Sequence, residues 1–372
     1  MTATILFCTT GWLLGWWALG RPRRVADLPV GSLVRSDAGP HRAVTVVIPA
    51  RDEALSIGAL LGDLDRERPP GSRVVVVDDH SQDATAGIAA GFGFVEVMEA
   101  PDLPTGWTGK CWACHSGAAD VDDGVLVFLD ADVRLDDGAL GRVVDEQERT
   151  GGLVSVQPWH DAERPYEKMS ALFNVVAVMG AAAGSRRGPS GAFGPVLATT
   201  VEDYRLMGGH AAVSDEVVED VALAQRYRRA GLGTAILTGS GGVRFRMYPG
   251  GFRTLVDGWT KNFASGAGST RLLRLAAIVF WITSLGSAAL AAVDGLQGDV
   301  PAWAAAALYA AFTLQLVVMF RQVGRFGFVT AVCFPVLVVF FMVVFLRSLW
   351  RTHVRHAVHW RGRVVPVGAA RG

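Results

Sequence analysis

The chain has 372 residues, of which 51% are hydrophobic, and its 35 basic and 35 acidic residues cancel to a net charge of zero. This apolar content exceeds that of an ordinary soluble protein, which predicts that part of the chain lies in a membrane. Zero net charge, without a basic run interleaved with aromatics in the central region, argues against a nucleic-acid partner. The four scattered cysteines indicate no disulfide framework.

The first predicted element is the apolar segment Thr2 to Leu19, which is followed at once by Arg21, Arg23 and Arg24. A secretory signal peptide has the opposite order, with its basic residues before the apolar stretch. We therefore expect an uncleaved transmembrane anchor over residues 1–20, with its basic end in the cytoplasm.

Strand and helix patterns alternate over the next part of the chain, for which we expect one domain at residues 41–270. Short apolar runs that end in polar or turn residues predict strands, and the stretches between them predict helices. This alternation is typical of an α/β fold with a mostly parallel sheet and helices on both faces. The predicted strands are 44–48, 73–77, 94–97 and 125–129, and the predicted helices are 52–66, 83–90 and 219–230.

Charged residues follow the first two strands. Pro49 is expected to stop the first strand, and the following residues through Glu53 are expected to open a helix. The second strand ends in Asp78-Asp79, of which only one carboxylate is needed near the next helix. The other is well positioned to accept a hydrogen bond from a base or a ribose hydroxyl.

A glycine-flanked loop follows at Gly106-Trp107-Thr108-Gly109-Lys110. Glycines let a backbone approach a phosphate closely, and Lys110 supplies a positive charge in a chain that is otherwise rich in arginine. The next residues, Cys111 to His115, match the C-x-x-C-H pattern for covalent haem attachment. We disfavour haem because that chemistry requires an export compartment, whereas the preceding charges predict the cytoplasm for this segment.

The strand at 125–129 runs directly into Asp130-Ala131-Asp132. Its branched apolar residues indicate burial on both faces, so the two acids lie at its carboxyl end, where open α/β sheets bind ligands. Mg²⁺ and Mn²⁺ prefer hard oxygen ligands, commonly one or two carboxylates together with substrate phosphate. Asp130 and Asp132 therefore predict a site for a metal diphosphate, although a solvated acid pair in a turn is an alternative.

Glu219 and Asp220 open the predicted helix at 219–230, where adjacent acids compensate the helix dipole or present a general base. Three apolar segments follow at 272–293, 302–320 and 326–346, each near the roughly 20 residues that a transmembrane helix needs. We expect transmembrane segments over 271–347 and a basic tail over 348–372. Three crossings would leave this tail outside, against the positive-inside tendency, so Pro335 marks the last segment as a candidate broken element.

These segments resemble the family 2 glycosyltransferases with a GT-A fold. The likeness covers residues 44–231 and rests on four motifs in order and at these spacings. Further matching segments are Leu153-Val154-Ser155-Val156-Gln157-Pro158, Phe193-Gly194-Pro195, Asp203-Tyr204 with Gly208-Gly209-His210, Phe245-Arg246-Met247-Tyr248, Gly258-Trp259-Thr260-Lys261 and Trp360-Arg361-Gly362-Arg363. These resemble the membrane-bound carotenoid-acid glycosyltransferases of the 4,4'-diaponeurosporenoate type, and the hopanoid-associated glycosyltransferases are also similar. The four motifs are Ile48-Pro49-Ala50-Arg51-Asp52-Glu53, Val77-Asp78-Asp79-His80-Ser81-Gln82-Asp83-Ala84-Thr85, Asp130-Ala131-Asp132 and Glu219-Asp220.

The resemblance implies a function for individual residues. On the donor side, the nucleotide would be bordered by Pro49, Arg51, Glu53, Asp79, Lys110, Asp130 and Lys261. Asp132, with Asp130, would ligate Mg²⁺ or Mn²⁺, and Asp220, with Glu219, would be the catalytic pair. The acceptor would meet Gly209, His210 and Trp259.

The implied activity is inverting, metal-dependent transfer of a hexose, glucose being the expected sugar, from a UDP-sugar to a terpenoid lipid such as a carotenoid acid or hydroxycarotenoid. The alternatives are a hopanoid or polyprenyl phosphate acceptor, or a non-catalytic scaffold among other pigment-synthesis enzymes. The Q-x-x-R-W motif of processive relatives is absent, which disfavours a polysaccharide synthase.

We expect a multi-pass protein of the cell membrane with a cytoplasmic catalytic domain. Asp132 and Asp220 must then face one compartment, so the apolar stretch 169–184 cannot be a single crossing. It is expected to lie along the membrane surface and to help receive the lipid.

Overall fold

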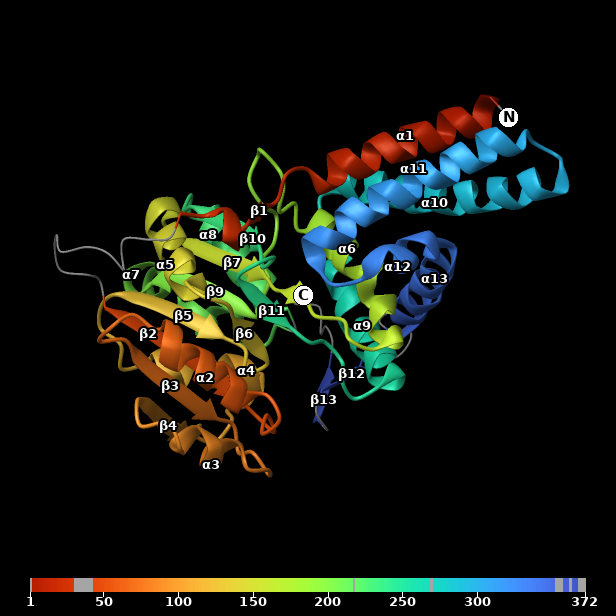
Figure 1. Ribbon diagram of the computed structural model, residues 1–372. Coiled ribbons are helices and arrows are strands. Elements are labelled where there is room, and N and C mark those ends of the chain that lie inside the picture. Colours follow the sequence, from red (N-terminus) through yellow and green to blue (C-terminus); the bar gives the residue numbers. More distant parts are fainter. Residues whose placement is uncertain are drawn as a thin grey trace. The chain divides into compact units, whose positions relative to one another are not determined.

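The structure is a computed structural model that describes residues 2–29, 43–216, 218–267, 270–351, 357–360 and 363–366 (Figure 1). The chain forms two compact units, which are described separately. We call them the helical unit and the α/β unit. The helical unit comprises Met1–Arg21, His160–Arg186 and Met247–Gly372, and the α/β unit comprises Pro22–Trp159 and Arg187–Arg246. Residues 160–186 and 247–270 thus group with the C-terminal helices rather than with the sheet.

An eight-stranded sheet forms the centre of the α/β unit, in the order β1-β10-β7-β9-β5-β2-β3-β4. Its neighbouring strands are parallel except for β9, which runs antiparallel to both β5 and β7. A small antiparallel pair, β6 and β11, lies in a second sheet with β8. The strands are β1 (Arg23–Arg24), β2 (Val44–Ala50), β3 (Arg73–Asp78), β4 (Val95–Glu99), β5 (Val125–Leu129), β6 (Val133–Leu135), β7 (Leu153–Gln157), β8 (Trp159–His160), β9 (Val196–Thr200), β10 (Thr234–Thr238) and β11 (Val243–Phe245).

Helices cover both faces of this sheet, because successive strand residues point to opposite sides. Val46 and Ile48 pack in one core with α2 and α5, whereas Val47 packs in the other with α4 and α8. The predicted α/β class with helices on both faces is confirmed. The helices of this unit are α2 (Ile57–Glu67), α3 (Thr85–Ala90), α4 (Gly109–Ala118), α5 (Ala139–Thr150), α7 (Val201–Leu206) and α8 (Glu219–Arg229), with 3₁₀ turns η1 (Val25–Asp27) and η4 (Gly209–Val213).

Two local predictions at the end of β2 are wrong. Pro49 does not stop the strand, which continues to Ala50. The ladder to β5 ends at Val47, so the missing N–H of Pro49 interrupts no pairing on that side. The following helix begins at Ile57 rather than at Asp52, because Asp52 has a left-handed φ of 53° that a helix does not accept.

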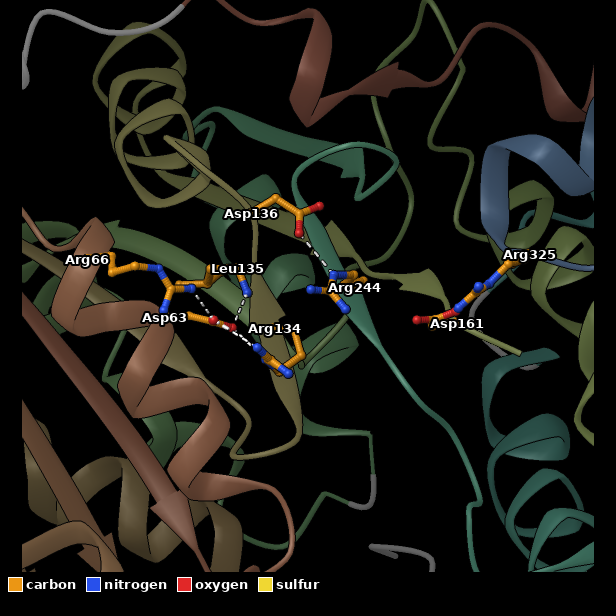
Figure 2. A network of polar contacts seen from close by, with 8 residues as sticks. All are labelled: Asp63, Arg66, Arg134, Leu135, Asp136, Asp161, Arg244 and Arg325. Atoms are coloured by element: carbon orange, nitrogen blue, oxygen red, sulfur yellow. Dashed lines mark hydrogen bonds and ion pairs between the residues drawn. The ribbon is translucent and has the colours of Figure 1, made fainter. Parts of the chain in front are cut away.

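A buried carboxylate joins α2 to β6 (Figure 2). The Asp63 side chain, 1% exposed, accepts hydrogen bonds from Nε of Arg134 at 2.5 Å, from the Leu135 N–H at 3.1 Å and from Arg66 at 2.7 Å. β6 follows Asp132 directly, so this contact fixes the chain just beyond the strand-end acids. Although burial opposes ionisation, these donors together lower the pKa of Asp63.

In the described part of the helical unit, three helices are long and apolar enough to cross a membrane: α1, α10 and α11. Arg274 donates to the carbonyl oxygens of Ala18 and Met179, so one side chain links α10 to the ends of α1 and α6. The elements of this unit are α1 (Thr2–Leu19), η3 (Pro165–Ser170), α6 (Ala171–Gly180), α9 (Phe252–Ala267), α10 (Leu272–Gln297), α11 (Ala302–Val323), α12 (Gly327–Val332), α13 (Phe334–Trp350), β12 (Ala357–Trp360) and β13 (Arg363–Pro366).

The third C-terminal apolar segment is interrupted. It forms two helices, α12 and the 17-residue α13, with Cys333 between them at a non-helical ψ of 22°. Pro335 lies in the first turn of α13, where its missing N–H costs no helical hydrogen bond. The break is therefore beside the residue that the sequence singled out.

The apolar stretch at 169–184 contains a short helix that is buried within the helical unit. α6 has only 10 residues, and its buried side chains include Phe173 and Asn174. Its length of about 15 Å is too small for a crossing. The position of this stretch along the membrane surface stays a prediction.

The Asp63 contact predicts a large effect of a small change. Asp63→Asn leaves Arg134 with a neutral partner and should lower the free energy of unfolding by roughly 3 kcal/mol. When one partner of a buried ion pair is removed, the desolvation of the remaining charge is no longer compensated. Thermal unfolding of the full chain in detergent measures this. The matched change Asp65→Asn, on the same helix at an ion pair of 3.5 Å with a 59% exposed carboxylate, should have little effect. Equal midpoints for the two variants would contradict the assignment.

Candidate active site

The ends of β2 and β3 form the first half of the site. Nη1 of Arg51 donates to the Asp79 carbonyl oxygen at 2.9 Å and to its Oδ2 at 3.1 Å, and Asp79 is 4% exposed. The two loops are bonded further, since the backbone N–H groups of Asp52 and Glu53 donate to the hydroxyls of Ser81 and Thr85. These bonds hold Arg51 and Asp79 at one edge of the sheet.

Lys110 joins the end of β5 to the start of α8. Its Nζ lies 2.7 Å from Oδ1 of Asp130 and 3.2 Å from Oε1 of Glu219. Lys110 is in the first turn of α4, whose N-terminus is capped by the Thr108 hydroxyl accepting from the Cys111 N–H. One ammonium group therefore contacts acids from two separate elements.

The charges around Lys110 shift one another. Burial opposes the ammonium form, but Asp130 and Glu219 raise the pKa of Lys110, which stays charged. Although burial opposes ionisation of Glu219 as well, Lys110 lowers the pKa of that carboxyl. Burial raises the pKa of Asp130 despite Lys110, and burial with the like charges of Asp130 and Glu53 raises the pKa of Asp132 to about 7.

Asp220 lies in the first turn of α8, next to Glu219. Burial and the charge of Glu219 raise the pKa of Asp220 to about 7, although the N–H groups of Val221 and Gly194 donate to its carboxylate. A carboxyl group with a pKa near neutrality is suited to take up a proton during a reaction. The structure thus brings together Asp130, Glu219 and Asp220 around Lys110. The spacing of the motifs in the sequence could not establish this proximity.

The donor atoms at Asp130 and Asp132 fit a divalent cation. They are hard carboxylate oxygens, and burial together with neighbouring carboxylates raises the pKa of both groups, which a bound cation would counteract. Among the residues the structure describes, no cluster of three or more His, Cys, Asp or Glu side chains is disposed to hold a metal. The set therefore fits an ion that takes its remaining ligands from water and substrate phosphate.

Known proteins are similar to this chain in sequence and in fold. The family "Glycosyl transferase family 2" matches residues 45–193. The 4,4'-diaponeurosporenoate glycosyltransferase of Staphylococcus aureus strain USA300 is 36% identical over 335 residues, which are 87% of this chain and 88% of that protein. Its counterpart in strain MRSA252 has the same identity and coverage.

The chain is a family 2 glycosyltransferase. A solved structure, mannosyltransferase PcManGT from Pyrobaculum calidifontis in complex with GDP-Man and Mn²⁺, is similar with a TM-score of 0.56 and 18% identity, covering 94% of this chain and 99% of that one. At this identity the likeness concerns the GT-A fold alone.

Two of the residues predicted for the acceptor are packed inside this glycosyltransferase. The hydroxyl of Tyr204 lies 2.8 Å from Nδ1 of His210 and accepts from the His210 N–H at 3.1 Å. His210 is 1% exposed, and burial lowers its pKa to about 4. Gly209 has a left-handed φ of 52°, and a Cβ there would lie 2.5 Å from the Tyr204 ring. Both residues shape the η4 turn that precedes α8, and neither residue is open to a ligand.

Trp259 and Lys261 belong to the helical unit, whereas the other predicted donor-side residues belong to the α/β unit. Trp259 is 5% exposed, donates its indole N–H to the Ser170 hydroxyl at 2.9 Å and stacks on Phe173. Lys261 lies on α9 and is partly exposed.

The C-x-x-C-H cysteines of the glycosyltransferase are core residues. Cys111 and Cys114 are fully buried on α4, and the Cys111 thiol donates to the Val213 carbonyl oxygen at 3.6 Å. Burial raises the pKa of Cys111 to about 12. Inert, buried thiols are unsuited to haem attachment.

One residue of the site was missed as a functional position. Gly194 is buried and donates its N–H to Asp220, and a Cβ there would lie 3.0 Å from Nζ of Lys110. The motif Phe193-Gly194-Pro195 is visible in the sequence, but it carries no titratable group. Because its contribution is made by the backbone, residue chemistry gave no signal for it.

Proposed function

We propose that this glycosyltransferase moves a hexose, glucose being the expected sugar, from a UDP-sugar to a carotenoid acid or another terpenoid in the membrane. The observation that carries the proposal is the Lys110 ammonium held between Asp130 and Glu219, since it unites a donor-side and an acceptor-side acid. Support for the acceptor class comes from the 36% identity, over 88% of its length, with a protein named 4,4'-diaponeurosporenoate glycosyltransferase.

On the donor side, Asp79 and Arg51 meet the uracil and ribose, with Pro49 and Glu53 bordering them. The Arg51 to Asp79 contact supports this proposal, because it fixes a hydrogen-bonding carboxylate before the nucleotide arrives. Lys110 lies near the diphosphate, where its charge favours a phosphate oxygen. Lys261 is proposed as a further donor contact on the motif resemblance alone.

Asp132 and Asp130 hold Mg²⁺ or Mn²⁺ in this proposal. Such an ion, when bound, neutralises charge that develops on a diphosphate leaving group. The chain's own contribution is to place both carboxylates near Lys110, at the end of a rigid strand. Glu53 adds negative charge to the same region, as the raised pKa of Asp132 indicates.

The reaction is a displacement at the anomeric carbon. An acceptor oxygen forms a bond to that carbon from the face opposite the diphosphate, the bond from carbon to the diphosphate oxygen breaks, and the configuration inverts. For a hydroxyl acceptor, Asp220 takes up the proton, and Glu219 holds Lys110. For a carboxylate acceptor, already ionised with a pKa near 4 to 5, no proton needs to be removed.

We also propose a multi-pass protein of the cell membrane with its α/β unit in the cytoplasm. Arg21 follows α1 and Arg271 precedes α10, so the positive-inside tendency assigns both helix ends to the cytoplasm. α11 then returns the chain to that side, near Arg321. With α12 and α13 as a broken, non-crossing element, the arginine-rich tail also remains inside. In the acceptor region, Gly209 and His210 support the η4 turn, and Trp259 packs against Phe173 in the part of the helical unit that we propose to receive the lipid chain.

A transfer assay with radiolabelled UDP-glucose tests the proposal. Membranes that contain the protein and a carotenoid acid should form a labelled, organic-extractable ester and release UDP. EDTA should stop the reaction and Mn²⁺ or Mg²⁺ should restore it. Asp132→Asn should lower transfer by at least about 10²-fold at any metal concentration, whereas the neighbouring exposed change Asp137→Asn should not. Labelled hopanoid or polyprenyl phosphate in place of the ester would overturn the acceptor assignment, and failure to release UDP would overturn the activity.

Asp220→Asn separates the two acceptor classes. Transfer to a hydroxycarotenoid should fall by about 10² to 10⁴-fold, because the proton has no base to receive it. Transfer to a carotenoid acid should fall much less. Initial rates at saturating donor measure both, with Glu216→Gln, an exposed acid on the same loop, as the control. Equal and severe losses would refute a base function for Asp220.

The pKa of about 7 for Asp220 predicts opposite pH dependences. A base acts when deprotonated, so transfer to a hydroxyl should rise as pH increases through about 7. An ionised Asp220 repels a carboxylate acceptor, whereas the protonated form can donate a hydrogen bond to it. The ratio of hydroxyl to carboxylate transfer, measured at each pH on one preparation, cancels titration on the donor side. This ratio should increase between about pH 6 and 8, and a constant ratio would contradict the assignment.

A further inference from the structure

The segment Phe193 to Pro195 touches both sides of the site through its backbone. The Pro195 carbonyl oxygen accepts from the Asp130 N–H at 2.9 Å. The Gly194 backbone lies against the Asp220 side chain, and its N–H opposes the rise in the pKa of that carboxyl. The Phe193 N–H donates to the Ser155 hydroxyl at 2.9 Å, which ties the segment to β7. Three consecutive residues therefore hold the backbone of a donor-side acid and border the side chain of an acceptor-side acid.

Gly194 is a glycine because of what lies beside it. A Cβ at this position would be 3.0 Å from Nζ of Lys110 and 3.5 Å from both Cβ and Oδ2 of Asp220. Its φ lies outside the left-handed region that favours glycine, so backbone strain does not explain the residue. The close approach of Lys110 and Asp220 to the Gly194 backbone explains the glycine. A methyl group at this position would enter the space between an ammonium donor and a carboxylate acceptor.

That space has the chemistry of an oxygen site. Lys110 can donate a hydrogen bond into it, and Asp220 can accept one from it. An acceptor hydroxyl is both acceptor and donor, so it can bind Lys110 and Asp220 at once and be aligned for proton removal. A carboxylate can bind Lys110 and, when Asp220 is protonated, Asp220 as well.

We propose that Gly194 is a positioning residue of the acceptor side: it orients the Asp220 carboxylate and leaves room between Asp220 and Lys110 for the attacking oxygen. This inference rests on the proposed transfer reaction and names where its acceptor oxygen binds. Gly194→Ala puts a methyl group beside the Lys110 ammonium, which Asp130 and Glu219 hold in position. The ammonium must yield by a few tenths of an ångström, so the fold should survive while the oxygen site is lost.

The test compares Gly194→Ala with Gly87→Ala in the full-length protein. Gly87 is an exposed glycine of α3 in the same unit, and a Cβ there would meet nothing within 4 Å. Gly194→Ala should lower kcat/KM for the acceptor by about tenfold or more, because misplacement of reacting groups by less than 1 Å is costly. Because Lys110 is also proposed to lie near the diphosphate, the dissociation constant of UDP with Mn²⁺ should rise by a smaller factor than the one by which kcat/KM falls. Gly87→Ala should leave both quantities unchanged.

A double substitution isolates the physical cause. With Lys110→Ala present, the methyl group of Gly194→Ala meets no ammonium, so the two changes should be less than multiplicative in their effect on kcat/KM. Unchanged acceptor kinetics in Gly194→Ala, an equal loss of UDP binding, or fully multiplicative effects would each overturn the inference. If the wild-type protein binds UDP but transfers no sugar, the proposed function is overturned instead. The two failures can be told apart because UDP binding and transfer are measured separately for the wild-type protein and for Gly194→Ala.

Discussion

The site depends on one positive charge among several carboxylates. Asp130, Glu219 and Asp220 converge in a partly buried region where water screens poorly, and Lys110 contacts the first two directly. Without that ammonium group, mutual repulsion would drive the acids to protonate or separate. The contact also links β5 to α8 through α4. The position of the Lys110 ammonium group therefore determines both the charge balance of the site and the packing of these three elements.

Much of the α/β unit could be predicted because apolar runs mark buried parallel strands. The strand at 125–129 and the acids that follow it were found as expected, and Asp79 does lie at the end of a strand. Features fixed by the backbone could not be predicted. The reversal of β9, the late start of α2 after Asp52 and the Gly194 N–H contact leave no pattern of hydrophobicity or charge. The opposite error occurred at His210 and Gly209. The sequence predicted an acceptor-binding function for them, but in the structure they are packed against Tyr204.

The apolar segments were recognisable from composition, but length alone could not say which of them cross. The break at Cys333 leaves α13 with 17 residues, and α1, α10 and α11 as the helices long enough to span. That arrangement agrees with the proposal that the arginine-rich tail stays on the cytoplasmic side. The buried Arg274, which binds carbonyl oxygens at the ends of two other helices, shows that the helix ends are held by polar contacts as well as by apolar packing.

The interleaving of the two units affects how the protein can be made. The chain passes from one unit to the other at 21–22, 159–160, 186–187 and 246–247. β7 is synthesised before α6, yet its neighbour β10 is synthesised after it, so the sheet cannot close during translation until a helix of the other unit has left the ribosome. The two units are thereby made in alternation, and a fragment cut before α10 would retain α1 and α6, which pack against α10 within the helical unit.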